Sequence, residues 1–445
     1  MIRSNPPRPA WTLLAALCVL GLSLPAHAVD VSAVGALTPF NPANALDLAT
    51  FCNGTDTGDD TNCIGAWLAA GKARGVHLTA SPGTYRYRAG KAIFQGFHLQ
   101  CKSTAAVFQA IDNAGSLFVL APNWLAEGPT AWQDISIENC GFDLNGSTAN
   151  FASVITLIGG TRPVRHVTIR GNRIFDATQP GRMYTASNQQ RQYIGVLHAE
   201  QVLIEDNALS EGGRIKAGRP GRWLHIRRNV LSNINDNGIT VVDLGSNTSH
   251  DILIEDNAIF FPIGSGIFFG ADGQAQGTAA MTLHDITVRG NTVFGTWKTN
   301  GITGVLPNHT ANVYVFNNRV HHTGSANPLA YTSGIGLNRN NTATLIVPDL
   351  TTATNDVYSD ALNAYRNVAG IFVTGGMTAP CVSFNVVTNT STSVFASTTP
   401  TPIYLRNIVR ETVLEDNTLY SGTVRLGPTS TVDPEGNPVT CFRDE

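Results

Sequence analysis

The sequence predicts an all-β protein: a right-handed, single-stranded parallel β-helix, or solenoid, with a small N-terminal cap of one helix and one strand. Three observations support this fold class. A strand-like phrase that ends in asparagine returns along much of the chain, its copies have the spacing of solenoid coils, and Asn-Gly hairpin signals between strands are rare. Antiparallel sandwiches, the alternative for short strands, need such hairpins.

The recurring phrase is a short strand followed by a polar corner. Alternating apolar residues lead into the asparagines Asn172, Asn207, Asn229, Asn257, Asn291, Asn318 and Asn417, and Cys140 takes this place in an earlier copy. We expect the apolar residues, such as Ile254, to point into the interior, and their neighbours, such as Glu255, to point outward and to tolerate substitution. We expect the corner asparagines to adopt left-handed backbone geometry and to hydrogen-bond from coil to coil.

A second phrase opens another strand after each corner. It is a glycine followed by isoleucine or valine, at Gly195, Gly238, Gly266, Gly301, Gly334 and Gly370. Each coil is therefore predicted to contain a strand, an asparagine corner, a loop of variable length and a further strand. The glycines should then give the register between neighbouring coils.

The first 28 residues are predicted to be a secretory signal peptide. Arg3 and Arg8 precede an apolar run over residues 11–24, and Ala26 and Ala28 provide the small residues of a cleavage site. Lipidation at Cys18 is disfavoured because Leu17 occupies the position where such signals need a small residue. No later apolar run approaches the length of a membrane span. We therefore expect a periplasmic or secreted protein with no membrane span.

Residues 29–100 are predicted to form the N-terminal cap region, and residues 101–445 the β-helix. After Asp59-Asp60-Thr61, a short amphipathic helix is expected over residues 62–74, followed by a strand that ends in Pro82-Gly83-Thr84-Tyr85. A solenoid needs such a cap because its first coil otherwise exposes unpaired strand edges.

The cysteines fit an oxidising compartment. Removing Cys18 with the signal peptide leaves six of the seven cysteines, an even number. Sequence alone does not fix their pairing; we predict Cys52–Cys63, Cys101–Cys140 and Cys381–Cys441. Metal binding is the alternative, but the chain has no Cys-x-x-Cys pair.

The overall charge argues against nucleic acid as a partner. The formal net charge is −3, and charged residues make up 14% of the chain. Nucleic-acid binding usually needs a concentrated basic surface, which this composition does not supply.

The Asp-Asp-Thr segment, the helix, the Pro-Gly-Thr-Tyr strand and the asparagine-cornered coils together resemble the pectate-lyase-like β-helix superfamily, in its tailspike and rhamnogalacturonase/epimerase branch. The resemblance covers nearly the whole chain after the signal peptide. It implies a polysaccharide partner bound along one flank of the solenoid. It does not choose a reaction, because the superfamily includes lyases, hydrolases, epimerases, phage depolymerases and inactive members.

Motifs of individual enzyme families narrow the choice little. The polygalacturonase set is represented only by Arg214-Ile215-Lys216; Gly-His-Gly is absent, and the only Asp-Asp pair, Asp59-Asp60, lies in the cap. The Asp-Pro-His-Asp motif of alginate epimerases is also absent. The chain therefore does not match either family.

The densest mixed-charge stretch predicts the candidate catalytic site. Aligning Gly195, Arg214 and Gly238 places Glu200, Arg219 and Asp243 in one row across three coils, and Lys216, Asp236 and His198 lie close by in sequence. On an acidic polysaccharide, Lys216 or His198 would be the base. Arg214 and Arg219 would neutralise the uronate carboxylate, and Glu200, Asp236 and Asp243 would orient them. The structural alternative is a solvated salt-bridge ladder.

Residues that grip and stack on sugars are predicted beside this row. They are Arg182, Tyr184, Arg191 and Tyr193 of the long polar segment 176–193, together with Arg222. No cofactor is expected. Calcium at the Glu-Asp-Asn corners, Glu205-Asp206, Glu255-Asp256 and Glu415-Asp416, is the alternative to repeated turn chemistry.

The functional prediction is an exported carbohydrate-active protein, with a lyase on an acidic polysaccharide favoured. A glycoside hydrolase using Asp236 and Asp243, which needs paired carboxylates, is one alternative. A non-catalytic protein that binds polysaccharide through the same surface is the other.

Overall fold

The computed structural model describes residues 34–54, 58–112, 114, 116–120, 133–147, 153–178, 192–243, 248–271, 282–296, 299–306, 309–321 and 332–339. Towards the C-terminus it describes residues 350–353, 356–359, 367–374, 381–383, 386–389, 403–406, 413–415, 417–419 and 425–426. The predicted signal peptide lies outside these residues. Within them, no helix is long and apolar enough to cross a membrane.

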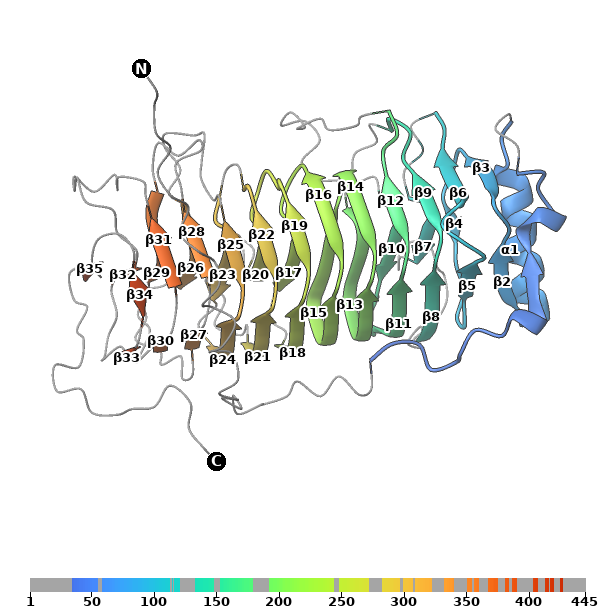
Figure 1. Ribbon diagram of the computed structural model, residues 1–445. Coiled ribbons are helices and arrows are strands. Elements are labelled where there is room, and N and C mark those ends of the chain that lie inside the picture. The colour runs from blue at the N-terminus through green and yellow to red at the C-terminus, as the bar shows by residue number, and fades with distance from the viewer. Residues whose placement is uncertain are drawn as a thin grey trace, which may run out of the picture.

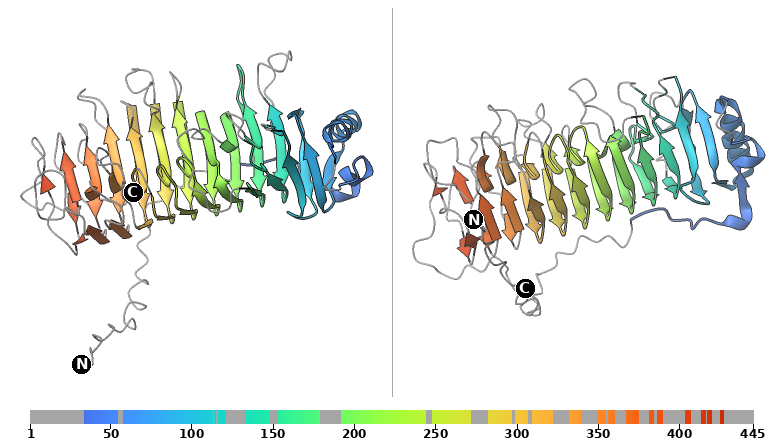
Figure 2. Two further views of the ribbon diagram at one scale, coloured as in Figure 1. Left: turned by 90° about the horizontal axis from the view of Figure 1, so that it is seen from above. Right: turned by 45° about the horizontal axis from the view of Figure 1, so that its top comes forward.

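The chain forms an elongated solenoid of parallel strands, with its only described helix at the N-terminal end (Figure 1). The strands fall into three lanes that run along the axis. Lanes 1 and 2 make up a 23-stranded sheet, lane 3 is a 12-stranded sheet, and every strand pair in both sheets is parallel. Figure 2 shows the same stack of coils from two further sides. This is the right-handed parallel β-helix that the sequence predicts.

Lane 1 contains β4 (Lys91–Ala92), β7 (Phe118–Leu120), β10 (Ile155–Ile158), the first halves of β13 (Gln192–Glu205) and β15 (Arg214–Arg227), β17 (Ile239–Asp243), β20 (Ile267–Ala271), β23 (Ile302–Leu306), β26 (Thr332–Arg339), β29 (Asn367–Thr374), β32 (Ile403–Arg406) and β35 (Arg425–Leu426). The in-register Gly-Ile phrases belong to β17, β20, β23, β26 and β29.

Lane 2 contains the strands that lead into the asparagine corners. They are β1 (Ala45–Asp47), β2 (His77–Ala80), β5 (His98–Cys101), β8 (Gln133–Glu138), β11 (Val164–Arg170), the second halves of β13 and β15, β18 (Thr248–Glu255), β21 (Thr282–Arg289), β24 (His309–Phe316), β27 (Leu350–Ala353), β30 (Cys381–Ser383) and β33 (Val413–Glu415).

Lane 3 follows each corner. Its strands are β3 (Gly83–Tyr87), β6 (Ala106–Ala110), β9 (Gly141–Asp143), β12 (Arg173–Phe175), β14 (Ala208–Gly212), β16 (Val230–Ile234), β19 (Ala258–Phe260), β22 (Thr292–Phe294), β25 (Arg319–His321), β28 (Asp356–Ser359), β31 (Val386–Asn389) and β34 (Thr418–Leu419). A coil therefore runs from lane 1 through lane 2 and the corner to lane 3.

The interior is filled by every second residue of each strand, as alternation predicts. Ile215, Ile239, Ile267 and Ile302 are fully buried and lie in register along lane 1. In lane 2, Ile254 is likewise fully buried. The inward position predicted for Ile254 is thus confirmed.

The corner asparagines form a continuous hydrogen-bonded ladder. In one repeat of the pattern, the side-chain amide of Asn257 donates to Oδ1 of Asn291 at 2.9 Å, while Oδ1 of Asn257 accepts from Asn229 at 3.0 Å. The ladder begins at Cys140, whose backbone N–H donates to Oδ1 of Asn172 at 3.0 Å. The prediction of coil-to-coil bonding is confirmed.

The predicted backbone geometry of these asparagines was wrong by one position. The left-handed residue is the one before each asparagine, for example Asp206 with φ 57°, Asp256 with φ 54° and Gly290 with φ 64°. The side chain of each ladder asparagine bonds to the next coil, and the residue before it makes the turn. Two adjacent residues therefore divide the hydrogen bonding and the turn between them.

The outward residues just before the corners carry alternating charge. In register along lane 2 these are Glu138, Arg170, Glu205, Arg227, Glu255 and Arg289, here called the charge row. Glu255 is outward but only 9% exposed, and it accepts from Nε2 of His225 at 2.7 Å and Nη2 of Arg289 at 2.6 Å. The expectation that Glu255 tolerates substitution freely is therefore wrong.

The N-terminal helix α1 (Thr61–Arg74) covers the end of the first coil (Figure 1), close to the predicted bounds. Short 3-10 turns at Pro42–Asn44 and Leu48–Thr50 precede it. Trp67 of α1 is fully buried, and its indole N–H donates to the carbonyl of Leu46 at 2.8 Å. Strand pairing already begins at β1, which precedes the helix in the sequence and pairs with β2, the strand that follows it.

Two of the three predicted disulfides are present. Cys52 bonds to Cys63, tying the segment before the helix to its first turn, and Cys101 bonds to Cys140, tying two early coils together. The third predicted pair, Cys381–Cys441, lies outside the described side chains.

Candidate functional site

The candidate site lies on the outer surface of lane 1, at the coils of β15 and β17. Ile215 and Ala217 are fully buried, so strand alternation directs Arg214 and Lys216 outward. These two cations are nonetheless only 9% and 8% exposed. Lysine and arginine are rarely buried to this extent, so the pair marks this surface as unusual.

Asp236 joins the pair from the turn between β16 and β17. Its carboxylate forms an ion pair with Nη1 of Arg214. Burial raises the pKa of Asp236 above its usual value, and the nearby Arg214 and Lys216 oppose that shift. The structure thus brings together Arg214, Lys216 and Asp236 of the predicted catalytic set.

Two donors in this cluster have no hydrogen-bond partner in the described structure. They are Nε of Arg214 and the hydroxyl of Thr240, and both atoms are buried. Thr240 lies opposite Lys216 in the next coil and is 3% exposed. A buried donor without a partner costs about 1–3 kcal/mol, which a bound acceptor would recover.

The register prediction for this surface was wrong at one coil. Gly195 lies opposite Lys216, and Ile194 is the residue that matches Ile215 and Ile239. The glycines from Gly238 onward do align, since Ile239, Ile267, Ile302, Ile335 and Ile371 are in register. Gly195 instead occupies the outward position that Lys216 fills one coil later.

As a result, Glu200 lies opposite Arg222 and not opposite Arg219. Glu200 forms ion pairs with Nε of Arg165 at 2.8 Å and with Nη1 of Arg222 at 3.2 Å. For these residues the salt-bridge ladder is what the structure shows. Arg222 follows Lys216 by six residues on one strand, about 20 Å along it, so neither Glu200 nor Arg222 reaches the cluster.

The other predicted residues divide into those placed elsewhere and those not described. Nδ1 of His198 lies 2.9 Å from the carbonyl of Gly160, at the bend between lanes 1 and 2. The side chains of Arg219 and Asp243, and the residues Arg182, Tyr184 and Arg191, lie outside the described part of the chain.

Tyr193 does not face a sugar. It is fully buried, its hydroxyl donates to the carbonyl of Glu211 at 2.7 Å, and its ring fills the space beside Gly213. The prediction that Tyr193 stacks on substrate was therefore wrong. Tyr193 lies at a register irregularity between Gln192 and Ile194, and there its side chain is buried together with that of Ile194.

Sequence reasoning missed two residues on this surface, Thr240 and Phe268. Phe268 follows Thr240 in register and is half-buried, so Lys216, Thr240 and Phe268 form an outward row on three successive coils. The correct alignment of the Gly-Ile phrases would have found both, because each is the second residue after the phrase's glycine.

A network of small polar groups borders the row at the corner from lane 3 to lane 1. The hydroxyl of Ser265 lies 2.7 Å from that of Thr303 and 2.9 Å from that of Thr299. Farther along, Oδ1 of Asn300 accepts from the backbone and hydroxyl of Ser333 at 2.7 and 3.0 Å. Such groups suit the hydroxyls of a sugar polymer.

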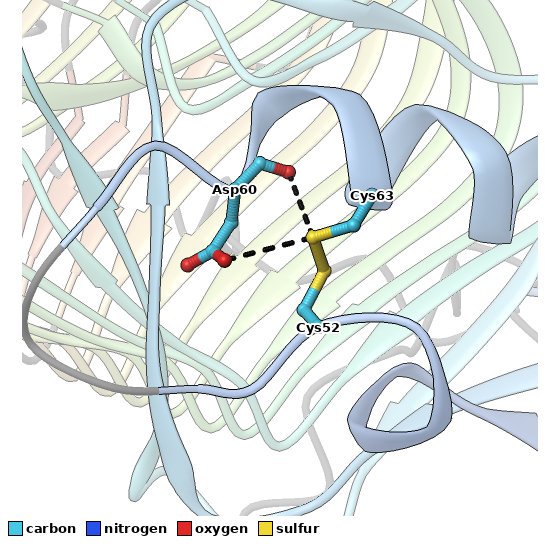
Figure 3. Close-up of side chains that lie close together, drawn as sticks. All are labelled: Cys52, Asp60 and Cys63. Atoms are coloured by element: carbon cyan, nitrogen blue, oxygen red, sulfur yellow. Dashed lines mark hydrogen bonds between the residues drawn. A yellow bond between two sulfur atoms is a disulfide. The ribbon is translucent and has the colours of Figure 1, made fainter.

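Of the residues considered for calcium, Glu205 and Glu255 are engaged in ion pairs, and the side chains of Glu415 and Asp416 lie outside the described part of the chain. Glu205 accepts from Arg170 at 2.5 Å and from Arg227 at 2.6 Å, and Glu255 from His225 and Arg289. Within the described residues, Cys52, Asp60 and Cys63 form a group close enough to hold a metal, but its two sulfurs are joined as a disulfide (Figure 3). In Figure 3 the backbone carbonyl oxygen and one carboxylate oxygen of Asp60 lie 3.2 and 3.6 Å from the bonded sulfur of Cys63.

Comparison with known proteins supports the fold and leaves the reaction open. No protein-family model and no curated protein sequence matches the chain. The Streptococcus pneumoniae surface protein and adhesin PfbA is similar in structure, with TM-score 0.54 and 14% identity over 86% of this chain and 99% of that one. The A-module of the Azotobacter vinelandii mannuronan C-5 epimerase AlgE6 is also similar in structure, with TM-score 0.50 and 14% identity over 87% of this chain and 99% of that one. The chain has the right-handed β-helix fold of pectate-lyase-like proteins.

Proposed function

We propose that this protein binds an acidic polysaccharide at the Arg214, Lys216, Asp236 and Thr240 cluster and cleaves it by β-elimination. The observation that carries the proposal is the pair of buried cations with two unpartnered donors on an outward strand surface. A uronate carboxylate would supply the missing acceptor for Nε of Arg214 and the hydroxyl of Thr240. Phe268 would offer an aromatic surface to an adjacent sugar ring.

The chemistry follows from the charges present. With its carboxylate bound to Arg214, the uronate loses its C5 proton to the amine of Lys216, and guanidinium and hydroxyl stabilise the negative charge that develops on the carboxylate. The electron pair forms the C4–C5 double bond while the C4–O bond breaks, and the leaving oxygen takes a proton from water. Asp236 holds the Arg214 guanidinium in place.

A location outside the cytoplasm is part of the proposal. The two disulfides support it, because disulfides persist in oxidising compartments. The predicted signal peptide is the corresponding sequence feature.

The test is a screen of the purified protein against uronate polymers, followed by variants on whichever polymer is cleaved. Elimination is detected by ultraviolet absorbance of the unsaturated ends. Lys216→Ala should lower kcat by about 100-fold or more, as loss of a positioned base does. Arg214→Lys should also lower kcat strongly, because the ammonium of lysine is a point charge and cannot hold a carboxylate at two points as the planar guanidinium of arginine does. Arg173→Ala, an exposed arginine in lane 3, is the charge-loss control and should behave as wild type.

Thr240→Val is the sharpest variant. It removes an unpartnered hydroxyl at nearly constant volume, so the melting temperature should stay the same or rise. Substrate binding should weaken by about 10-fold, the value of one hydrogen bond to a charged group. A loss of stability without a change in KM would contradict the proposed carboxylate contact.

A hydrolase is the second candidate, and one observation favours it. The raised pKa of Asp236, caused by burial, is what a general acid requires. New reducing ends without ultraviolet absorbance would support hydrolysis. Binding that depends on Arg214, with no cleavage of any polymer, would support a non-catalytic polysaccharide-binding protein.

A further inference from the structure

The N-terminal segment 34–41, here called the arm, lies along the outside of lane 2 far from the candidate site. In Figure 1 it runs beneath the solenoid to the cap. The backbone N–H of Gly35 donates to the carbonyl of Gln201 on β13 at 3.0 Å. The backbone N–H of Ala36 donates to the hydroxyl of Thr168 on β11 at 2.8 Å. The arm thus crosses several coils and is held by each in turn.

Asp134 on β8 is the strongest anchor of the arm. Its Oδ1 accepts from the backbone N–H groups of Leu37 at 2.7 Å and Thr38 at 3.1 Å, and its Oδ2 accepts from the Thr38 hydroxyl. These bonds, together with the nearby His98, hold the pKa of Asp134 below its usual value despite partial burial. The carboxylate must therefore be ionised to hold the arm well.

Three histidines line the surface beneath the arm. The N–H of Asn41 donates to Nδ1 of His77 at 2.7 Å, and Phe40 packs on the same ring with centroids 5.3 Å apart. His98 lies 4.7 Å from His77, ring to ring, and its Nε2 lies 3.4 Å from Asp134. His166 lies at the next coil, where its Nδ1 is buried and has no hydrogen-bond partner in the described structure.

We propose that these histidines and Asp134 make the arm a pH-sensitive latch, docked at neutral pH and released by mild acid. A protonated His77 cannot accept the Asn41 N–H. A protonated His98 would add positive charge next to His77, and a protonated His166 would add it next to Arg165, with Asp134 as the nearby anion for both. Arg165 is itself paired with Glu200.

The direction of the effect follows from proton linkage. Burial lowers the pKa of His77, His98 and His166 below 6.5; Asp134 opposes each shift, and at His166 a bond to the backbone of Gly35 opposes it as well. The Asn41 N–H donates to Nδ1 of His77 in the docked arm, so docking disfavours a proton on that nitrogen and weakens as pH falls below about 6.5. Protonation of Asp134 below its ordinary value of 3.8 acts in the same direction at lower pH. Acid releases the arm in two stages, the first at mildly acidic pH.

The experiment is hydrogen–deuterium exchange of residues 35–41 in the full-length protein, corrected for intrinsic exchange rates. Between pH 7.5 and 5, protection of these amides should fall by about 10-fold or more, while amides of the β15 and β18 interior stay protected. The double variant His77→Gln/His166→Gln keeps polar side chains that do not titrate, and it should lose most of this pH dependence.

Two further variants complete the test. Asp134→Ala should release the arm already at pH 7.5, and continued protection would show that Asp134 is not the anchor. His250→Gln removes a lane 2 histidine beyond the arm and should behave as wild type. Protection that stays constant down to pH 5, or falls equally in the double variant, overturns the latch. These readouts do not depend on polysaccharide activity.

Discussion

Individual residues in this solenoid are governed by what lies one coil above and below them. The charge row shows this. Its carboxylates form ion pairs with arginines on adjacent strands, so the environment of a carboxylate cannot be predicted from its own strand alone. Two members of the row respond in opposite ways. Bonds from His225 and Arg289 lower the pKa of Glu255 to about 2, whereas burial raises the pKa of Glu138, whose partner Arg170 lies 3.7 Å away.

These opposite shifts give a paired prediction. Glu255 contributes stability above pH 4.5, and that contribution is lost as pH falls from 4.5 toward 2. Glu255→Gln should therefore be less stable than wild type at pH 7, by about 1–3 kcal/mol, and the difference should shrink in acid. Ionising Glu138 costs stability, so Glu138→Gln should match or exceed wild type at pH 7 and lose that advantage as pH falls toward 4.5. Denaturant unfolding from pH 7 to 3 measures both; parallel profiles for the two variants would contradict the assignment.

At the residue scale the sequence predicted inward and outward positions correctly but not the degree of burial. Ile254 and Glu255 show the difference. Alternation depends only on the strand, whereas the burial of Glu255 depends on His225 and Arg289, which come from neighbouring coils. The same holds for Lys216, whose outward direction is local and whose burial is not.

The asparagine corner is the element that repeats most faithfully. Each asparagine bonds to the next asparagine and to backbone carbonyls; the amide of Asn257, for example, also donates to the carbonyls of Ile226 at 2.9 Å and Glu255 at 3.0 Å. The turn itself is made by the residue before it, and glycine, aspartate, asparagine and arginine all occur there with positive φ. The sequence pattern predicted the position of the corner, but it did not show which residue makes the turn and which one bonds between coils.

Substitutions at adjacent positions should separate these tasks. Asn257→Gly would leave several buried donors and acceptors unsatisfied, and it should cost roughly 3 kcal/mol or more. Asp256→Gly should be neutral or slightly stabilising, since Gly171 and Gly290 occupy the same position with φ 65° and 64°. Melting temperatures of the two variants provide the measurement. The reverse order would mean that the asparagine is needed for its backbone and not for its amide.

Register is where element-scale prediction failed, and the cause is specific. The residue pair Gly195-Val196 imitates the Gly-Ile phrase but lies two residues past its equivalent position, because Tyr193 takes the place of the glycine. A two-residue shift preserves alternation, so nothing in the pattern reveals it. The shift placed Glu200 in a row with Arg219, whereas Glu200 lies opposite Arg222.

At the scale of the whole molecule, fold class, cap helix and two disulfides could be predicted because each rests on local or repeated signals. The candidate site could be predicted only in part. Arg214 and Lys216 are neighbours on one strand, whereas Asp236, Thr240 and Phe268 join them only through stacking of coils. The arm depends wholly on tertiary contacts, such as that of Ala36 with Thr168, and no sequence pattern predicted it.

A stack of coils also differs from a compact domain in how far a perturbation travels. Each coil contacts mainly its neighbours, so stability is close to a sum of coil and interface terms.

Cys101–Cys140 joins positions 39 residues apart on successive early coils, at the start of the asparagine ladder. Its removal by Cys101→Ser/Cys140→Ser should lower the free energy of opening of β5 and β8 by roughly 4 kcal/mol, the loop-closure value for such a span. The strands β21 and β24, several coils away, should exchange as in wild type. Hydrogen exchange resolved along the chain makes the comparison, with Cys52→Ser/Cys63→Ser as the matched control, whose effect should stay within the cap. A loss of protection spread evenly from β5 to β24 would show that the coils unfold as one cooperative unit.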